Sequence, residues 1–260
     1  MKKIIKYILY LVYEKRLATK LLLGPAPQHL GVILDGNRRF AKALNLPVAE
    51  GHKYGAKKVK DLLRWCIEFK IPVVTVWGFS TQNFSRDAAE VQALMDLIVE
   101  QANAMRVDED FKKNDIRVKV IGRVDQMPPE AREALSKLET STAERKGMLV
   151  QLALGYGGRE EIVDAAKAYL STAEKAGKSL HDAIGGLTEE TLSTHLYSGD
   201  VPDPDFIIRT SGEVRLSGFL LWQAAYSEYY FLDVNWPAFR RIDFLRALRS
   251  FQQRQRRFGK

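Results

Sequence analysis

The stretch HLGVILDGNRRFAK, residues 29–42, joins a short apolar run to a carboxylate, a glycine and two arginines. An apolar run of this length, bounded by turn residues, is typical of a buried strand, and this one ends at Leu34. Gly36 allows a sharp turn, and a helix that follows it would present free backbone N–H groups to an anion. The stretch therefore predicts a strand–turn–helix unit with Asp35 at the carboxyl end of the strand.

Similar apolar runs recur along the chain and alternate with amphipathic helical patterns. The predicted strands are Val32–Leu34, Val73–Trp77, Ile116–Ile121, Leu149–Leu154, Phe206–Ile208 and Tyr229–Val234. Apolar residues repeat with the helical period within 59–67, 91–98, 131–138 and 162–170. Buried strands that alternate with helices predict an α/β fold: a single domain with a mostly parallel central sheet of about six strands, flanked by helices. Residues 171–186, with three glycines, are expected to form the most flexible connection.

Composition favours one large domain and removes several classes of protein. The chain has 260 residues, 46% of them hydrophobic, and a single cysteine, Cys66. One cysteine excludes an intrachain disulfide and a cysteine zinc cluster, and its place on an apolar helical stripe predicts a core position. No P-loop or complete dinucleotide-binding fingerprint is present. No cleavage site for a signal peptide is evident, so we expect a cytoplasmic protein.

The net charge of +8 is concentrated at the two ends of the chain. Residues 1–20 carry +5 and residues 240–260 carry +7, which leaves −4 for the body. A nucleic-acid binder spreads its basic residues over one contiguous surface, so we expect no nucleic-acid partner.

Residues 1–24 are expected to form an amphipathic helical extension to a main domain of residues 25–260. The apolar stretch of the extension is too short to span a bilayer. It is either an interfacial helix that rests on the cytoplasmic face of a membrane, or a helix packed on the body or on a second copy.

Two further strands end in polar loops, FSTQNFSR (79–86) and IIRTSGEVRLS (207–217). Ligands of open α/β sheets bind at the carboxyl ends of strands, and forked arginines there suit a diphosphate. A carboxylate beside such arginines predicts Mg²⁺ between Asp35 and the diphosphate. The alternatives are an ordinary turn at Asp35-Gly36 before a cationic helix start, and an ordinary helix cap in the second loop.

Glu228 follows the last of these loops and is surrounded in sequence by Tyr226, Tyr229 and Tyr230. A carboxylate in such a setting is costly unless it is paired or bound to a metal. Glu228 is therefore either a second metal ligand or part of a structural ion pair.

The motifs HLGVILDGNRRFAK, GHKYGAKK, FSTQNFSR, IIRTSGEVRLSGFLLWQ and YSEYYFLDVNWP occur in this order. Together they closely resemble the cis-prenyltransferases, the undecaprenyl diphosphate synthase family, over residues 27–260. The C-terminal Arg257-Phe258-Gly259 is similar to the R-x-G of that family, and LPVAEGHKYGAKK (46–58) is most similar to archaeal members. Relative to many members, Val48 replaces an arginine and Gln82 a glutamate.

The resemblance implies a Mg²⁺-dependent, homodimeric enzyme that condenses isopentenyl diphosphate with an allylic diphosphate. The starter would be farnesyl or geranylgeranyl diphosphate. The product would be a medium-to-long-chain polyprenyl diphosphate such as undecaprenyl diphosphate, a lipid carrier for glycosylation. Two alternatives are a short-chain or non-head-to-tail prenyltransferase, and a non-catalytic partner subunit of the same fold. Such subunits lose the aspartate that Asp35 retains.

Carried over residue by residue, the resemblance also implies roles for the motif residues. Asp35 would bind Mg²⁺ with Glu228 and assist departure of the allylic diphosphate. Asn83 would assist proton removal, with a diphosphate oxygen or a water as alternative acceptors. The implied substrate contacts are Gly36, Asn37, Arg38, Arg39, Phe40, His52, Ser80, Thr81, Gln82, Phe84, Arg86, Arg209, Arg215, Leu216 and Ser217. Strands 73–77 and 149–154 would form the wall of an apolar tunnel for the growing chain.

Overall fold

A computed structural model describes residues 2–254, with side chains from Leu9 onward. Its core is one sheet in the order β3-β4-β2-β1-β5-β6, and every neighbouring pair is parallel. The strands are β1 (His29–Ile33), β2 (Val73–Ser80), β3 (Arg117–Ile121), β4 (Leu149–Tyr156), β5 (Phe206–Arg209) and β6 (Glu228–Phe231). All six coincide with predicted strands, and the predicted α/β fold is confirmed.

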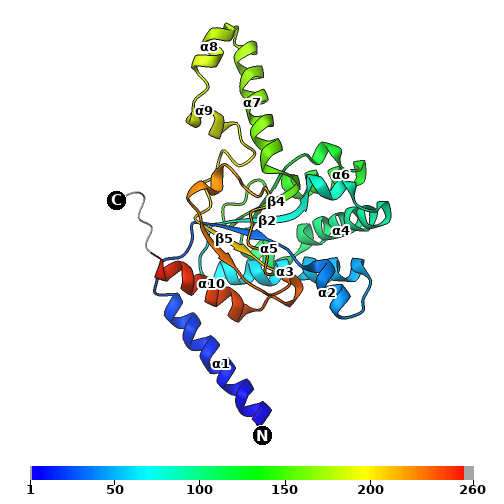
Figure 1. Cartoon of the computed structure of the whole chain (residues 1–260), viewed down its shortest axis with the longest axis vertical. Coiled ribbons are helices and arrows are strands. Elements are labelled where there is room, and N and C mark those ends of the chain that lie inside the picture. The colour runs from blue at the N-terminus through cyan, green and yellow to red at the C-terminus, as the bar shows by residue number, and fades with distance from the viewer. Residues whose placement is uncertain (1, 255–260) are drawn as a thin grey trace.

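Helices flank this sheet (Figure 1). The α-helices are α1 (Lys2–Leu21), α2 (Asn37–Ala43), α3 (Val48–Glu68), α4 (Ala88–Val107), α5 (Glu109–Lys113), α6 (Pro129–Thr142), α7 (Gly158–Lys175), α8 (Leu180–Gly185), α9 (Glu189–Thr194) and α10 (Arg241–Gln253). Short 3₁₀ helices are η1 (Thr81–Ser85), η2 (Val124–Gln126), η3 (Gln223–Tyr226) and η4 (Trp236–Ala238). The four predicted helical stripes lie in α3, α4, α6 and α7.

The side chains of β1 alternate between two apolar cores. Leu30 and Val32 belong to the larger core, which also contains side chains of α3, α4, α6 and α10. Ile33 belongs to the smaller core on Phe219 and Leu220. Cys66 is fully buried in the larger core, which confirms the predicted position, and burial raises the pKa of its thiol. A strand buried on both faces has little freedom to move, so it fixes the residues that follow it.

The parallel register places three strand ends side by side. Ile33 pairs with Trp77 of β2 and with Arg209 of β5, so the loops after β1, β2 and β5 leave the sheet at one edge. Gly36 begins the turn after β1 with a φ of 108°, and a Cβ there would lie 2.5 Å from the Asn235 side chain. A residue other than glycine would therefore be strained and crowded at this position.

Two segments project from the body at opposite ends (Figure 1). One is an arm formed by α7, α8 and α9. Residues 171–186, expected to be a flexible connection, are mostly helical within this arm. The Tyr169 hydroxyl donates to the Ala183 carbonyl at 2.9 Å and ties α7 to α8. The other segment is α1.

The C-terminal half of α1 is attached to α10. Leu17 and Leu21 are buried, and Arg241 donates to Glu14 at 2.9 Å. The interpretation as a helix packed on the body is thus confirmed for this half. Farther toward the N-terminus, Leu9 is 63% exposed. None of the helices within residues 2–254 is long and apolar enough to cross a membrane. Arg257-Phe258-Gly259 lies outside the described residues.

Candidate active site

A polar cavity of about 480 Å³ opens at the carboxyl ends of β1, β2 and β5. It is lined by predicted site residues from distant parts of the sequence: Asp35, Gly36, Asn37, Arg38, Arg39, His52, Ser80, Asn83, Arg86 and Arg209. The tertiary structure therefore brings together one carboxylate, several cations and short polar side chains, as an anionic ligand would require.

Asp35 is held in this cavity through its backbone and one carboxylate oxygen. Its carbonyl accepts from the Thr210 hydroxyl at 2.6 Å and from the Trp236 N–H at 2.9 Å. Its Oδ2 accepts from Arg209 Nη2 at 2.9 Å. Among the described residues, no hydrogen bond or ion pair reaches Asp35 Oδ1, and the side chain is 28% exposed. One oxygen thus remains available to a ligand.

Arg209 connects Asp35 to the loop after β5. Its side chain is 5% exposed, and its Nη1 donates to Ser217 Oγ at 2.8 Å and to the Arg215 carbonyl. Arg215, Leu216 and Ser217 do not themselves line the cavity. Ser217 and the Arg215 carbonyl contact the buried guanidinium of Arg209, which does line the cavity, so we call this segment the rim of the cavity.

Glu213 is a further carboxylate in this loop that the sequence interpretation missed. Arg39 Nη2 donates to Glu213 Oε1 at 2.6 Å, and Arg215 donates to Oε2. Arg39 also donates to the Ser211 carbonyl at 2.8 Å. Glu213 therefore holds two arginines from different segments side by side, and its place between Arg209 and Arg215 in the motif was the available signal.

The loop after β2 divides its polar side chains between the cavity and the protein interior. The Ser80 N–H donates to Asn83 Oδ1 at 3.0 Å, and both residues line the cavity. Thr81 instead donates to Glu160 at 3.0 Å, and the ring of Phe84 lies 4.8 Å from that of Phe79. Besides Arg215, Leu216 and Ser217, four more of the predicted substrate contacts are not among the lining residues: Phe40, Thr81, Gln82 and Phe84.

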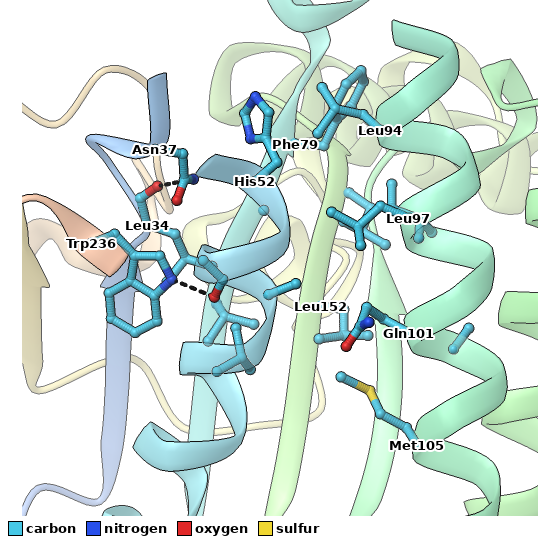
Figure 2. Close-up of a pocket in the computed structure, with 18 of the residues that line it drawn as sticks. Leu34, Asn37, His52, Phe79, Leu94, Leu97, Gln101, Met105, Leu152 and Trp236 are labelled. Carbon is cyan, nitrogen blue, oxygen red and sulfur yellow. Dashed lines mark hydrogen bonds between the residues drawn. The ribbon is translucent and has the colours of Figure 1, made fainter. Parts of the chain in front are cut away.

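An apolar cavity of about 120 Å³ continues from the polar one. The residues common to both are Leu34, Asn37, His52, Gly78, Phe79 and Leu94. Figure 2 shows this cavity between α3, α4 and the sheet, with His52 and Phe79 near one end and Gln101 and Met105 near the other. Val76 of β2 and Leu152 of β4 belong to its wall, as the predicted tunnel requires.

The entrance to the apolar cavity lies where β2 is irregular. The pairing of β2 with β4 shifts between Trp77 and Phe79, so Gly78 is exposed to both cavities. Phe79 and Leu94 were not predicted as site residues, because apolar residues at strand ends and on helices usually belong to the core.

The structure does not bring Glu228 to Asp35 within one chain. Glu228 pairs in register with Phe206, which pairs with Leu30, so it lies at the amino end of its strand. Asp35 is five residues beyond Leu30, roughly 16 Å away along the strands at ~3.3 Å per residue. Glu228 accepts from Arg254 at 2.6 Å, which matches the alternative of a structural ion pair.

The donor set fits a magnesium ion that arrives with its ligand. Within the part of the chain that the structure describes, no three or more His, Cys, Asp or Glu side chains form a group that could hold a metal ion. Mg²⁺ commonly binds through one or two carboxylates while substrate phosphates and waters supply the other ligands. Asp35, with Oδ1 available, meets that requirement.

Comparison with known families gives one family model over most of the chain. Residues 33–259 match the model described as putative undecaprenyl diphosphate synthase. An isoprenyl transferase of Thermus thermophilus is 54% identical over 252 residues, which cover 97% of this chain and 96% of that protein. A tritrans,polycis-undecaprenyl-diphosphate synthase (geranylgeranyl-diphosphate specific) of Methanopyrus kandleri is 46% identical over 251 residues, 96% of this chain and 91% of that protein.

Two solved structures are similar over nearly their full length. Lavandulyl diphosphate synthase from Lavandula x intermedia, in complex with dimethylallyl diphosphate, has a TM-score of 0.82 and 34% identity over 90% of this chain and 98% of its own. A probable undecaprenyl diphosphate synthase from Campylobacter jejuni has a TM-score of 0.72 and 31% identity, covering 91% of this chain and all of its own.

Proposed function

Because the chain belongs to the undecaprenyl diphosphate synthase family and is a cis-prenyltransferase, we propose that it condenses isopentenyl diphosphate with farnesyl or geranylgeranyl diphosphate. The product would be a medium-to-long-chain polyprenyl diphosphate that serves as a lipid carrier. One observation carries this proposal: a cavity lined by Asp35 and arginines continues directly into an apolar cavity. That pair of cavities suits an ionised head group joined to a hydrocarbon tail.

The polar cavity would stabilise charge that develops on the departing allylic diphosphate. Guanidinium groups that are already oriented need no reorganisation as this charge develops, which is the main source of electrostatic catalysis. Arg38, Arg39 and Arg86 would bind the allylic diphosphate. Arg209, with Arg215 and Ser217 at the rim, would bind isopentenyl diphosphate.

Asp35 would hold Mg²⁺ through its available oxygen, since Oδ2 is engaged by Arg209. When bound, the ion would act as a Lewis acid on the phosphate oxygens. Asn83 would orient the isopentenyl group for loss of its proton. An amide is a weak base, so a diphosphate oxygen or an ordered water would be the acceptor.

The apolar cavity would shelter the hydrocarbon tail from water. Its volume of about 120 Å³ is close to that of an engineered cavity of about 150 Å³ that binds benzene, so it has room for about one five-carbon unit. A longer tail would have to displace Gln101 and Met105. With Ala56, these two side chains separate the apolar cavity from a surface cleft between α3 and α4. Both are unbranched and flexible, so such displacement would cost little.

The direct test is an incubation of the purified protein with Mg²⁺, isopentenyl diphosphate and each allylic starter, followed by mass spectrometry of the products. We expect a series of products that differ by five carbons, with a preference for one starter. No lengthened product from any starter would reject the proposal, and loss of turnover with EDTA would support the Mg²⁺ dependence.

A leucine at Gly78 is expected to shorten the products. A Cβ there would lie 3.2 Å from Leu154 Cδ2, so a larger side chain narrows the passage between the two cavities. We expect Gly78→Leu to shift the products toward shorter chains, as measured by product size. In the matched control Gly185→Leu, the new Cβ meets nothing within 4 Å, and the product length should be unchanged. Identical products from both variants would contradict the tail assignment.

The alternative of a short-chain or non-head-to-tail prenyltransferase is favoured by the similarity to lavandulyl diphosphate synthase. The same incubation with dimethylallyl diphosphate as a further starter distinguishes it, because a single short product would appear instead of a five-carbon series. The other alternative, a non-catalytic partner subunit, is disfavoured by the retained Asp35 and by its available oxygen.

The proposed homodimer is supported by apolar side chains that the arm exposes. Leu180 is 72% exposed and Ile184 is 65% exposed, and both lie on α8. Exposed apolar surface of this kind marks protein contacts. Light scattering should give twice the chain mass, 29.5 kDa each, and a monomer at micromolar concentration would contradict the assignment.

Membrane contact through residues 1–24 is proposed because α1 exposes both apolar and basic side chains. Leu9, Val12, Lys15 and Arg16 are all exposed. The test is co-sedimentation with anionic phosphatidylglycerol vesicles, with neutral phosphatidylcholine vesicles as reference. Leu9→Asp combined with Val12→Asp should abolish it. Deletion of the extension is less informative, because Leu17 and Leu21 are buried against the body. Equal sedimentation of variant and parent would contradict the proposal.

A further inference from the structure

Glu90 lies at the centre of two arginines and a histidine that converge from three segments. Its Oε1 is 3.0 Å from Arg86 Nη1, 3.3 Å from His52 Nε2 and 3.7 Å from Arg38 Nε. Arg38 belongs to α2, His52 to α3, and Arg86 ends η1. A single carboxylate thus connects the loops after β1 and β2, and it does so with 13% of its side chain exposed.

Helix capping does not account for this orientation. Glu90 occupies the third position of α4, where a glutamate commonly reaches back to the N–H of the capping residue. Here the cap is Asp87, whose Oδ1 accepts from the N–H groups of Ala89 and Glu90. The Glu90 carboxylate is turned away from the cap, toward the two arginines and the histidine.

Glu90 does not line the polar cavity, but all three of its partners do. It lines a neighbouring cleft between the N-terminal parts of α3 and α4, which shares His52 with the polar cavity. Glu90 therefore acts through Arg38, His52 and Arg86 and does not itself contact a ligand in the polar cavity. Its charge offsets the repulsion among arginines that would otherwise be gathered without an anion. Each arginine retains further N–H donors for a ligand.

We propose that Glu90 is a positioning residue for the allylic diphosphate: it fixes Arg38, His52 and Arg86 in the arrangement that receives this group. This inference rests on the proposed function. The arginines assigned to isopentenyl diphosphate are fixed by other carboxylates, since Asp35 binds Arg209 and Glu213 binds Arg215. Glu90 contacts none of the arginines assigned to isopentenyl diphosphate, so we expect its loss to act on the allylic position.

The test compares Glu90→Gln and Glu90→Asp with the control Glu100→Gln. Glu100 is an exposed glutamate on α4. It lines the same neighbouring cleft as Glu90 but contacts none of the three partners of Glu90. Calorimetry measures binding of geranylgeranyl or farnesyl diphosphate, whichever the parent binds more tightly, without isopentenyl diphosphate, so no elongation occurs. Steady-state kinetics then give the KM for each substrate, and urea unfolding gives the stability.

We expect Glu90→Gln to weaken allylic binding and to raise the allylic KM by about tenfold or more, the size of a charge-assisted hydrogen bond. The KM for isopentenyl diphosphate should stay within about twofold of the value for the parent. Glu90→Asp should recover part of the binding, and Glu100→Gln should match the parent. Unchanged allylic affinity in Glu90→Gln, or equal losses for both substrates, would overturn the proposal. So would tighter binding, which would make Glu90 a competitor of the diphosphate. A parent that neither binds nor elongates any starter would instead reject the proposed function.

Discussion

Replacement of Asp35 by asparagine or alanine should lower turnover by about 10³-fold or more while the protein stays folded, because the assigned site has one carboxylate to hold Mg²⁺. The asparagine variant is the sharper of the two. Its side-chain oxygen can still accept from Arg209, so the contact at 2.9 Å can persist without the negative charge. The alanine variant also leaves the buried guanidinium without that partner, and it should be somewhat less stable.

The measurement is kcat for isopentenyl diphosphate incorporation at saturating Mg²⁺, together with the midpoint of urea unfolding. Glu68→Gln is the matched control, because Glu68 also accepts from an arginine, Arg241 at 2.6 Å, but lies outside the cavity. That variant should retain the activity of the parent. Near-normal turnover in Asp35→Asn would refute the assignment of Asp35, whatever the unfolding midpoint.

Replacement of Arg209 by lysine is expected to lower kcat/KM for isopentenyl diphosphate by about 10²-fold or more, comparable to the loss of one preorganised donor. The guanidinium reaches Asp35 with Nη2, and Ser217 and the Arg215 carbonyl with Nη1. An ammonium group is a compact point charge without this planar fork, and it cannot replace these contacts together. Lysine therefore keeps the positive charge but loses either the contact with Asp35 or the contacts with Ser217 and the Arg215 carbonyl.

Arg240→Lys is the control for this substitution. Arg240 forms a forked contact with Asp243 at 3.0 and 3.2 Å, at the start of α10 and away from the cavity. Its replacement should change stability slightly and leave kcat/KM unaltered. If Arg209→Lys behaves like Arg240→Lys in kinetics, the geometry of the guanidinium is not what binds the diphosphate. Loss of activity accompanied by loss of folding would instead indicate a structural role.

The fold was predictable because the four central strands are largely buried on both faces. Val32–Leu34, Val73–Trp77 and Leu149–Leu154 are near-continuous apolar runs, and only a parallel sheet covered by helices buries such runs completely. The loops were predictable for a related reason. Asp35 directly follows a strand, and Arg209 ends one, so their positions at the carboxyl edge depend on strand direction alone.

Contacts between distant segments were not predictable in this way. Glu90 differs from an ordinary surface glutamate at a helix start only in its partners, Arg38 and His52, which come from other elements. Glu228 is the opposite case, in which the sequence suggested a site residue that the structure does not bring to Asp35 within one chain. Its odd surroundings in sequence suggested a metal ligand, whereas the strand register places it at the amino end of β6, far from Asp35 within one chain.

Local sequence thus determined the strands, the loops and which side chains could bind a diphosphate, since periodicity and turn chemistry act over a few residues. The tertiary structure decided which of these side chains face the cavity: Thr81 turns to Glu160 while Asn83 remains at the site. It also decided that the apolar cavity opens at Gly78. The direction of these side chains and the position of this opening depend on strand register and helix packing. Neither can be read from the residues themselves.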